Sequence, residues 1–264
     1  MAERSKRICL YDENKAKNIN QETLKLFQKY QIDMSIRDLS KNTIQQYNSD
    51  LMQWFIFMHD NQFNLSCLQA RDEDLEEYYY WRKQQGNNVN RQKRVMASIS
   101  AFYKFLRKKK LIVESPVEFI ERPKAGQPIT VQTYLTKEQV QLMREKLHEH
   151  GDTQLQSYAF VSLTTMARVN AVANLRWEQI DWDERIFSDV LEKEGKIVEL
   201  SFSEETKGYL ENLVQYRKDN EINDYGWVFI SPYVTEDKPI NNGTLNDWCK
   251  VIGEMIGEPT LHCH

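Results

Sequence analysis

Basic side chains spaced along one predicted helix are the residues best suited to chemistry in this chain. The helix starts at about Asn90, and its polar face comprises Arg91, Lys93, Arg94, Ser98 and Lys104. Cations and hydroxyls repeated along a helix can pair with successive phosphates of a nucleic acid. The basic run at residues 107–110 that follows, by itself, also suits a solvated helix end. Beside this polar face it favours phosphate contact, with Lys108 as the candidate.

Metal chemistry is a weaker interpretation of the C-terminal residues His262, Cys263 and His264. A structural zinc site needs a second cluster of ligands, and the sequence has no CxxC pair to provide one. The four cysteines are scattered through the chain: Cys9, Cys67, Cys249 and Cys263. We therefore expect no metal and no other cofactor, and reduced thiols as in a cytoplasmic protein.

The charge of the chain is unevenly distributed. The 264 residues carry a net charge of −4. Residues 35–110 nevertheless hold 13 Lys and Arg against 8 Asp and Glu, and residues 1–34 hold 7 against 5. Residues 111–264 hold 15 against 26. The positive charge therefore lies in the N-terminal half, and this distribution favours a nucleic-acid partner there.

The composition is that of an ordinary globular protein, with 41% hydrophobic and 28% charged residues. No run of about 18 apolar residues is present, so we expect no membrane-spanning helix and no membrane partner. The N-terminal residues lead into polar sequence and do not resemble a secretory signal. A cytoplasmic location follows as the expectation.

The elements that position the basic residues are predicted to be helical. Residues 1–34 suit an N-terminal arm or a leading helix, and residues 35–115 a compact helical domain. Its first helix begins near Thr43, with Ser40 or Asn42 as the cap, and has apolar residues three or four apart. A second helix begins near Asp72 and ends before Gly86. The helix from about Asn90 completes the domain.

A change in sequence pattern indicates a second domain. Three prolines and Gly126 punctuate a linker at residues 116–132. Residues 133–264 then open on a capping box formed by Thr136 and Gln139, followed by helices. Residues 186–191, 197–202 and 227–230 suit three strands, the first two joined by a turn at 192–196. The predicted fold is mainly α: a helical bundle followed by an α+β domain with a small antiparallel three-stranded sheet.

In order and spacing, these segments resemble the tyrosine recombinases, also called the phage integrase family. Residues 40–51, 74–75, 101–106 and 116–117 are similar to the family's SAM-like core-binding domain, which clamps one face of a DNA duplex. Residues 135–139 look like the start of its catalytic domain. Residues 165–181 look like the segment that carries its first catalytic arginine. Each match is weak alone, whereas their order together is specific.

The resemblance implies a set of site residues. Arg168 stands where the family has its first catalytic arginine, Lys193 where it has a lysine in a hairpin turn, and His264 at its His-x-x-Arg box. Lys196 is an alternative to Lys193. A structural ion pair for Arg168 and a solvated position for Lys193 stay open. At the first core-binding helix, the implied DNA contacts are Lys41, Asn42 and Thr43.

The chemistry implied by the family is the breakage of a DNA phosphodiester by a tyrosine hydroxyl, which forms a phosphotyrosyl intermediate. No metal is needed, because guanidinium groups can clamp the phosphoryl oxygens in the transition state. Arg168 would be one such clamp. Lys193 would protonate the leaving 5′ oxygen, and His264 would bind the phosphate or assist proton transfer.

The chain departs from the family pattern at two points. Ala171 stands where the family usually has an acidic residue. The family's second arginine, its later His or Trp and its nucleophilic tyrosine all lie beyond the box at His264. We therefore expect this chain by itself to be inactive and monomeric, and a complete recombinase to act as a homotetramer on double-stranded DNA.

Three functions remain open at this point. The first is a recombinase that integrates a phage or another mobile element. The alternative is a DNA-binding regulator, similar to a phage repressor, that has the recombinase fold without its catalysis. The third is a helical protein–protein module, for which the acidic C-terminal half is the only argument.

Overall fold

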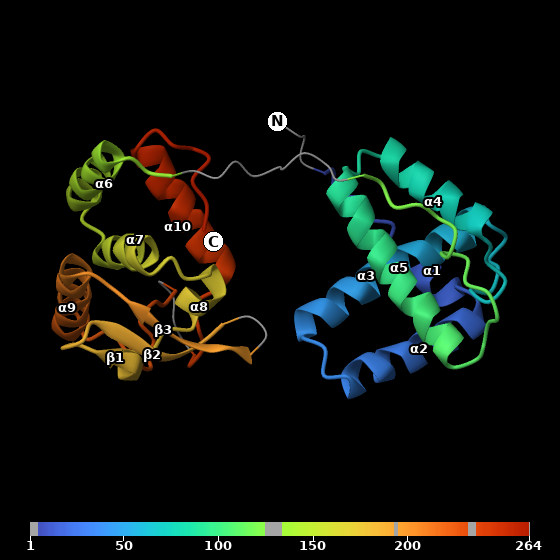
Figure 1. Ribbon diagram of the computed structural model, residues 1–264, viewed down its shortest axis with the longest axis horizontal. Coiled ribbons are helices and arrows are strands. Elements are labelled where there is room, and N and C mark those ends of the chain that lie inside the picture. The colour runs from blue at the N-terminus through green and yellow to red at the C-terminus, as the bar shows by residue number, and fades with distance from the viewer. Residues whose placement is uncertain (1–4, 125–133, 193–194, 232–235, 264) are drawn as a thin grey trace. The chain divides into compact units, whose positions relative to one another are not determined.

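The computed structural model describes residues 5–124, 134–192, 195–231 and 236–263 (Figure 1). The chain divides into two compact units, residues 1–129 and 130–264, each with its own hydrophobic core. Gly126 and Pro128 of the predicted linker lie outside the described residues. Within the described ranges, no helix is long and apolar enough to cross a membrane.

The described part of the first unit is helical. Its elements are α1 (Glu13–Asn18), α2 (Gln21–Ile36), α3 (Lys41–Asn61), α4 (Asp72–Gln84) and α5 (Val89–Lys108). The predicted helix starts near Thr43, Asp72 and Asn90 are confirmed to within two residues. Local capping explains this accuracy: the side chain of Ser40 accepts a hydrogen bond at the start of α3, and that of Asn88 does so at the start of α5.

Helix α2 shares the core of the first unit. Phe27 packs edge-on against Phe55 of α3 at 5.6 Å between ring centroids, and Tyr30 packs against Phe102 of α5 at 5.4 Å. Tyr30 is fully buried. Residues 1–34 were expected to form an arm or a leading helix, and the boundary drawn after residue 34 falls inside α2.

The second unit combines helices with a small sheet. Its helices are α6 (Lys137–His150), α7 (Thr153–Thr165), α8 (Val169–Ala173), η1 (Trp177–Gln179), α9 (Glu204–Asp219) and α10 (Asn242–Met255). Its strands are β1 (Ile180–Asp181), β2 (Ile186–Leu191) and β3 (Ile197–Ser201). The capping box of α6 is present: Thr136 and Gln139 exchange hydrogen bonds of 2.8 and 3.2 Å.

The sheet is antiparallel with the order β1-β2-β3, so the predicted three-stranded sheet is confirmed. The third strand is not the one predicted, however. Residues 227–230 form no strand, and Trp227 makes only an isolated bridge to Arg176. The carbonyls of Trp227 and Val228 instead accept hydrogen bonds from Arg217, at 2.8 and 2.7 Å. The buried guanidinium of Arg217 therefore binds the carbonyls that a neighbouring strand would otherwise bind.

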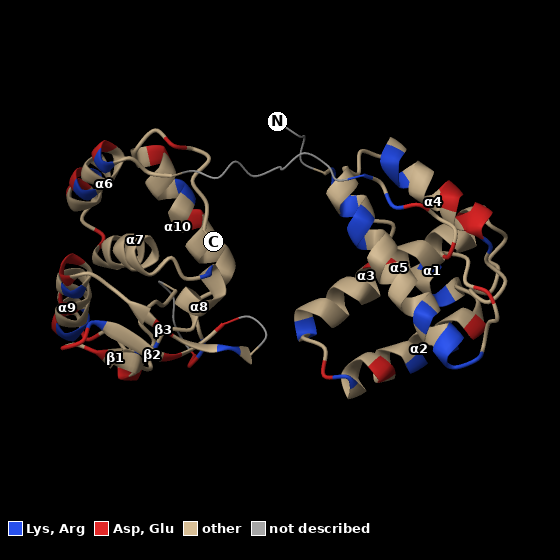
Figure 2. Ribbon diagram, in the orientation of Figure 1, with Lys and Arg blue, Asp and Glu red and all other residues tan. Residues whose placement is uncertain are grey.

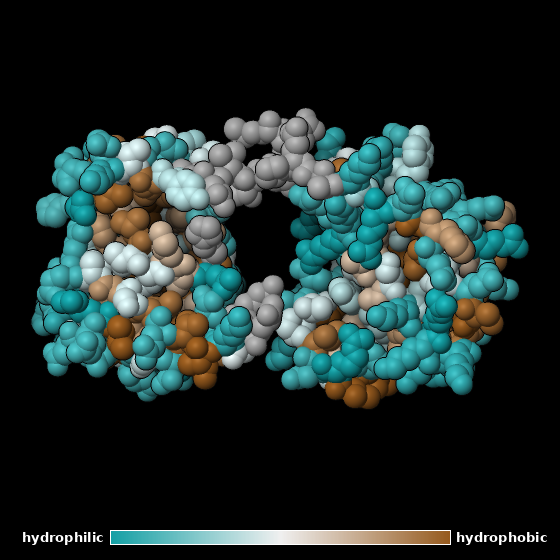
Figure 3. All heavy atoms as spheres, viewed as in Figure 1, coloured by the Kyte–Doolittle hydropathy of each residue, from teal (hydrophilic) through white to brown (hydrophobic). Residues whose placement is uncertain are grey.

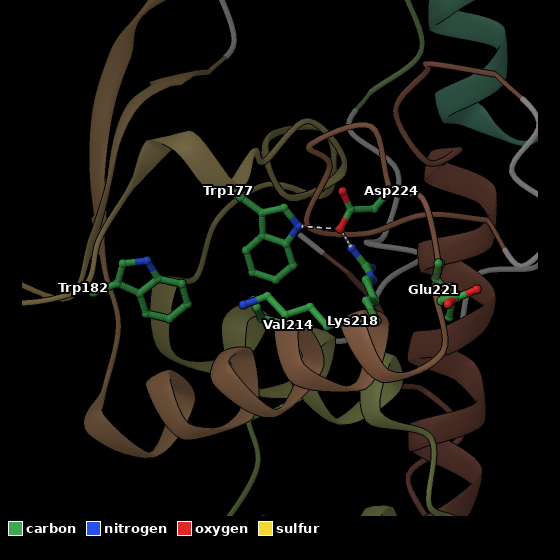
Figure 4. Close-up of a pocket in the computed structure, with 8 residues that line it drawn as sticks. Trp177, Trp182, Val214, Lys218, Glu221 and Asp224 are labelled. Atoms are coloured by element: carbon green, nitrogen blue, oxygen red, sulfur yellow. Dashed lines mark hydrogen bonds and ion pairs between the residues drawn. The ribbon is translucent and has the colours of Figure 1, made fainter.

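Arg217, on α9, is buried and joins three parts of the second unit. Besides those two carbonyls, its guanidinium binds Gln154 of α7 at 2.6 Å and the carboxylate of Asp224 at 2.8 Å. The indole N–H of Trp177 reaches the same carboxylate at 2.8 Å. Figure 4 shows the indole of Trp177 directed at Asp224, beside an open pocket. Arg217 is buried and Asp224 is partly exposed, so loss of the carboxylate would leave the guanidinium without its charged partner inside the fold.

Asp224 makes this arrangement sensitive to pH. Burial acts to raise its pKa, but hydrogen bonds from Arg217, from the Gly226 N–H and from Trp177 outweigh burial and hold the pKa below its ordinary value. A carboxylate whose pKa is lower in the folded state stabilises the fold above its unfolded pKa, about 3.9. That contribution is lost as pH falls through the lower folded pKa.

We expect the free energy of unfolding of the second unit to fall below about pH 4, and Asp224→Asn to weaken this dependence. Urea titrations followed by tryptophan fluorescence between pH 2 and 7 measure it. Asp219→Asn, at the exposed end of α9, is the matched control and should keep the wild-type profile. An unchanged profile in Asp224→Asn would contradict this assignment.

Candidate nucleic-acid interface and active site

A row of cations runs along α5, in which Arg94, Lys104 and Lys108 are exposed and Lys93 is half-buried. We call it the α5 strip: Lys93, Arg94, Lys104 and Lys108. Lys93 and Lys104 are eleven residues apart, about three helical turns, and Lys108 follows one turn later, so the three share one side. Ala97 and Ala101 lie between them on that side. Ser100, seven residues after Lys93, lies on that side as well, so only small side chains separate the cations. Figure 2 shows Lys and Arg toward both ends of α5.

Arg91 and Ser98 point away from this strip. They are seven residues apart, about two turns, and share a different side of α5. Both bind Asp50 of α3: the Ser98 hydroxyl donates to its carboxylate at 2.8 Å, and Arg91 forms an ion pair with it. Ser98 is fully buried, so the prediction that it contacts DNA is wrong. Its hydroxyl belongs to the core because helical periodicity turns it toward α3.

Asp50 fixes α3 against α5. Its carboxylate is only 1% exposed, and a buried charge of this kind is tolerated when it is paired and hydrogen-bonded. Arg82 of α4 is also buried, and its guanidinium donates to Gln53 of α3 at 3.4 Å and to the Tyr78 hydroxyl of its own helix at 2.7 Å. Burial raises the pKa of Tyr78 to about 12, so this hydroxyl stays neutral. Three helices are thereby held in one arrangement.

The start of α3 offers a second group of candidate contacts. Lys41 and Asn42 are exposed, as expected for contacts with a ligand. Thr43 is half-buried, and its hydroxyl is hydrogen-bonded to that of Ser40 at 2.8 Å. Thr43 therefore supports the cap of α3. Lys41 and Asn42 lie at the positive end of the helix dipole, where anions are favoured.

In the second unit, Arg168 is the N-cap residue of the short helix α8. Its side chain is 57% exposed and forms an ion pair with Glu192, which directly follows β2 and is 17% exposed. The Glu192 N–H donates to the Lys196 carbonyl at 2.7 Å, so the carboxylate belongs to the hairpin turn. The candidate catalytic arginine is therefore both accessible and neutralised by a carboxylate.

Of the remaining candidate residues, two lie outside the described part of the chain and two are placed by the structure. Lys193 and His264 lie outside the described residues. Lys196, the alternative lysine, is exposed on the same hairpin turn. Ala171, which stands where the family usually has an acidic residue, lies on α8 and is buried in the core. Glu192 brings a carboxylate to Arg168 from another element.

Sequence reasoning missed two functional candidates, Asp50 and Glu192. Asp50 had a visible signal: it falls on the apolar stripe of α3, between Tyr47 and Trp54, where a charged residue requires a buried partner. Glu192 had none, because an acidic residue in a polar turn is ordinary. Its contact with Arg168 arises only when the hairpin folds beside α8.

Two family models match the chain in sequence order. Residues 24–110 match the phage integrase N-terminal SAM-like domain. Residues 133–264, half of the chain, match the phage integrase family. The two matches lie in the two compact units.

Curated relatives are similar over part of their length. A putative tyrosine recombinase of Caldanaerobacter subterraneus is 31% identical over 147 residues, covering 54% of this chain and 49% of that protein. Tyrosine recombinase XerD of Halalkalibacterium halodurans is 29% identical over 146 residues, covering 54% and 48%. The matched region thus spans about half the length of these relatives.

Solved structures share the fold. A lambda integrase dimer bound to a core site aligns with a TM-score of 0.65 at 13% identity, covering 88% of this chain and 78% of that one. XerH recombinase bound to its difH substrate aligns with a TM-score of 0.61 at 10% identity, covering 92% and 76%. At these identities, the likeness concerns the fold alone.

The burial of Ser98 leads to a prediction that separates stability from binding. Ser98→Ala should lower the free energy of unfolding by about 1 kcal/mol, because Asp50 loses a buried hydrogen bond. It should leave the salt dependence of duplex-DNA binding unchanged. Lys104→Ala should instead keep the free energy of unfolding and reduce the salt dependence of binding. Urea denaturation and fluorescence anisotropy measure the two quantities. A Ser98→Ala variant of wild-type stability with a reduced salt dependence would reverse the assignment.

Proposed function

Because the chain belongs to the phage integrase family of tyrosine recombinases, we propose that it binds duplex DNA site-specifically and serves DNA strand breakage and rejoining in the protein that contains it. The proposed biological role is the integration or recombination of a phage or another mobile element. The observation that carries the proposal is the α5 strip. This row of cations, three of them exposed, lies on the unit that matches the family's SAM-like domain.

DNA binding is supported by charge placement in the first unit. The α5 strip and Lys41, with the start of α3, offer cations and a helix N-terminus to phosphates. The buried pair of Asp50 and Arg91 holds α3 and α5 together, so these groups form one rigid surface. We assign residues 35–115 to the core-binding domain, 116–132 to the linker and 133–264 to the catalytic-type domain, with α2 packed onto the first.

Strand cleavage is supported by the position of Arg168. Its exposed guanidinium can bind two phosphoryl oxygens and stabilise the charge of the transition state. In the family, a tyrosine hydroxyl attacks the phosphorus and the 5′ oxygen leaves. We propose Lys193, or Lys196 on the same turn, as the proton donor to that oxygen, and His264 as a further phosphate ligand. This chemistry calls for no metal or other cofactor.

Assembly and location follow from the same proposal. Lambda integrase is described as a dimer on a core site and as a tetramer on a Holliday junction. We propose a homotetramer on double-stranded DNA for the complete recombinase, with the cytoplasm of the host cell as its location.

A DNA-binding regulator without catalysis is the second candidate. It is favoured by Ala171 and by the Glu192 carboxylate, which neutralises Arg168. Selection from a pool of genomic fragments, with bound and SDS-resistant DNA scored separately for the full natural protein, distinguishes the two. A covalent adduct supports the recombinase, and specific binding without an adduct supports the regulator. Absence of binding at low salt would contradict both.

The α5 strip predicts a specific salt dependence. Lys104→Ala and Lys108→Ala should each weaken binding of duplex DNA and reduce the slope of log K against log salt by about 1, because each loses one phosphate contact. Anisotropy titrations between about 50 and 200 mM salt measure the slope. Lys17→Ala is the matched control, since Lys17 is exposed on α1 and paired with Glu13 at 2.8 Å. Equal slopes in all four proteins would remove the strip from the interface.

The ion pair at Arg168 predicts a gain of binding. Glu192→Gln should tighten duplex-DNA binding roughly three- to tenfold at low salt, because it frees the guanidinium for phosphate. Glu199→Gln removes the same charge from β3, where Glu199 is exposed, and controls for net charge.

The gain should disappear when Glu192→Gln is combined with Arg168→Gln, because the freed cation is then absent. Weaker binding by Glu192→Gln alone would show that the carboxylate positions Arg168 for phosphate. If Glu199→Gln tightened DNA binding equally, the change in net charge alone would account for the gain.

A further inference from the structure

The chain folds back on itself after α10. Residues 257–263, which we call the return segment, run against that helix. The Glu258 N–H donates to the Gly253 carbonyl at 2.7 Å, and the Leu261 N–H donates to the Glu258 carbonyl at 2.9 Å. A Cβ at Gly253 would lie 2.4 Å from the Glu258 carbonyl oxygen, so only glycine permits this approach. Gln139 of α6 fixes the Glu258 carboxylate at 2.6 Å.

The return segment brings two cysteines together. Cys263 and Cys249 of α10, fourteen residues earlier in the sequence, line the same pocket, and each thiol shifts the pKa of the other. The sulfur of Cys263 also lies 2.7 Å from the Tyr158 hydroxyl and 3.4 Å from the Leu245 carbonyl. Cys249 is buried and Cys263 is half-buried. The two thiols therefore meet at the edge of the core.

A pocket gives small molecules access to these thiols. Cys249, Cys263 and Tyr158 line an apolar pocket of about 300 Å³ in the second unit. In Figure 3, apolar residues of this unit gather between α6 and α10, two of the elements that line it. A small reagent can approach Cys263 from the pocket, with Cys249 behind it.

The two thiols differ in acidity. The Cys249 thiol holds the pKa of Cys263 at about 7, below its ordinary value, although burial acts in the opposite direction. The Cys263 thiol, together with burial, raises the pKa of Cys249. Burial raises the pKa of Tyr158, so its hydroxyl stays protonated and donates to the Cys263 thiolate. One thiol is the nucleophile near neutral pH, and the other keeps its proton.

We propose that Cys249 and Cys263 form a redox-active dithiol, which small disulfides oxidise to an intramolecular disulfide. The Cys263 thiolate attacks one sulfur of the reagent and releases a thiolate, leaving a mixed disulfide on Cys263. Cys249 passes its proton to the released thiolate and attacks the Cys263 sulfur, which expels a second thiolate that takes up the proton Cys263 had given to solvent. The two protein thiols are oxidised, and one reagent disulfide is reduced to two thiols.

The bond would fix the return segment to α10. A disulfide requires the sulfurs to approach to about 2.0 Å, and the short return segment lies at the surface, where it can follow. The loop closed by the bond contains the end of α10 and the whole return segment. Oxidation therefore restricts the same residues that the Glu258 hydrogen bonds hold in place. This inference does not depend on the proposed function.

The test is oxidation of the intact 264-residue chain by glutathione disulfide or by 2-hydroxyethyl disulfide, followed by mass spectrometry. We expect the mass of the protein to fall by that of two hydrogen atoms, with a peptide crosslink between Cys249 and Cys263. Cys263→Ser, Cys249→Ser and Cys249→Ala should each abolish this product, and circular dichroism checks their folding. Cys9→Ser and Cys67→Ser are matched controls and should keep it.

Two further measurements test the contact between Tyr158 and Cys263 and the position of the return segment. Tyr158→Phe should form the disulfide several-fold more slowly, with the pH profile of the rate displaced upward, because the thiolate loses a donor. Hydrogen exchange of residues 257–263 should slow on oxidation. Accumulation of a mixed disulfide on Cys263, or thiols that both stay free with excess reagent, would overturn the proposal. A crosslink that includes Cys9 or Cys67 would overturn it as well.

Discussion

The buried guanidinium of Arg217 is the interaction on which the second unit depends. It holds α7, α9 and residues 224–230 together through one set of charge-assisted hydrogen bonds. Residues 226–228 in turn bind the chain after α8, with the Val228 N–H on the Leu175 carbonyl and the Trp177 N–H on the Gly226 carbonyl, both at 3.0 Å. The position of Arg168, at the other end of α8, thus depends on a charge buried elsewhere in the fold.

A buried charge of opposite sign organises the first unit. The Asp50 carboxylate binds Arg91 and Ser98 and so holds α3 against α5. These contacts bury Ser98 and turn Arg91 toward α3, whereas Arg94, Lys104 and Lys108 of the same helix remain exposed. A carboxylate without its partner would be costly in this environment, so its pairing restricts α3 and α5 to one relative arrangement. Rigid placement of the α5 strip follows from this pairing.

The ion pair of Arg168 and Glu192 gives the candidate active site a defined resting state. A carboxylate is the protein group closest in charge and shape to a phosphate edge, so Glu192 occupies the guanidinium as a phosphodiester would. The carboxylate belongs to the turn that carries Lys193 and Lys196. Under the proposed function, a phosphate that binds Arg168 would have to displace the Glu192 carboxylate. Of the two interpretations of Arg168 in the sequence, the structure shows the ion pair, and the phosphate contact belongs to the proposed function.

Much of the fold follows from local rules. Ser40 and the box of Thr136 and Gln139 determine where α3 and α6 begin, because a cap acts within its own helical turn. The change of period after residue 185 predicts β2 and β3. The same local pattern failed for residues 227–230, where apolar residues suited a strand but the carbonyls bind a distant arginine.

The candidate site, like the fold, could be predicted from the sequence only in part. By itself, the sequence determined the residue types, the helix that carries the α5 strip, the family and the candidate Arg168. Only the tertiary structure decided that Ser98 is buried on Asp50, that Glu192 reaches Arg168 and that Cys263 meets Cys249. These contacts join residues from fourteen to forty-eight positions apart. No local preference specifies such pairs, because they form only when separate elements pack and buried charges and thiols must find partners.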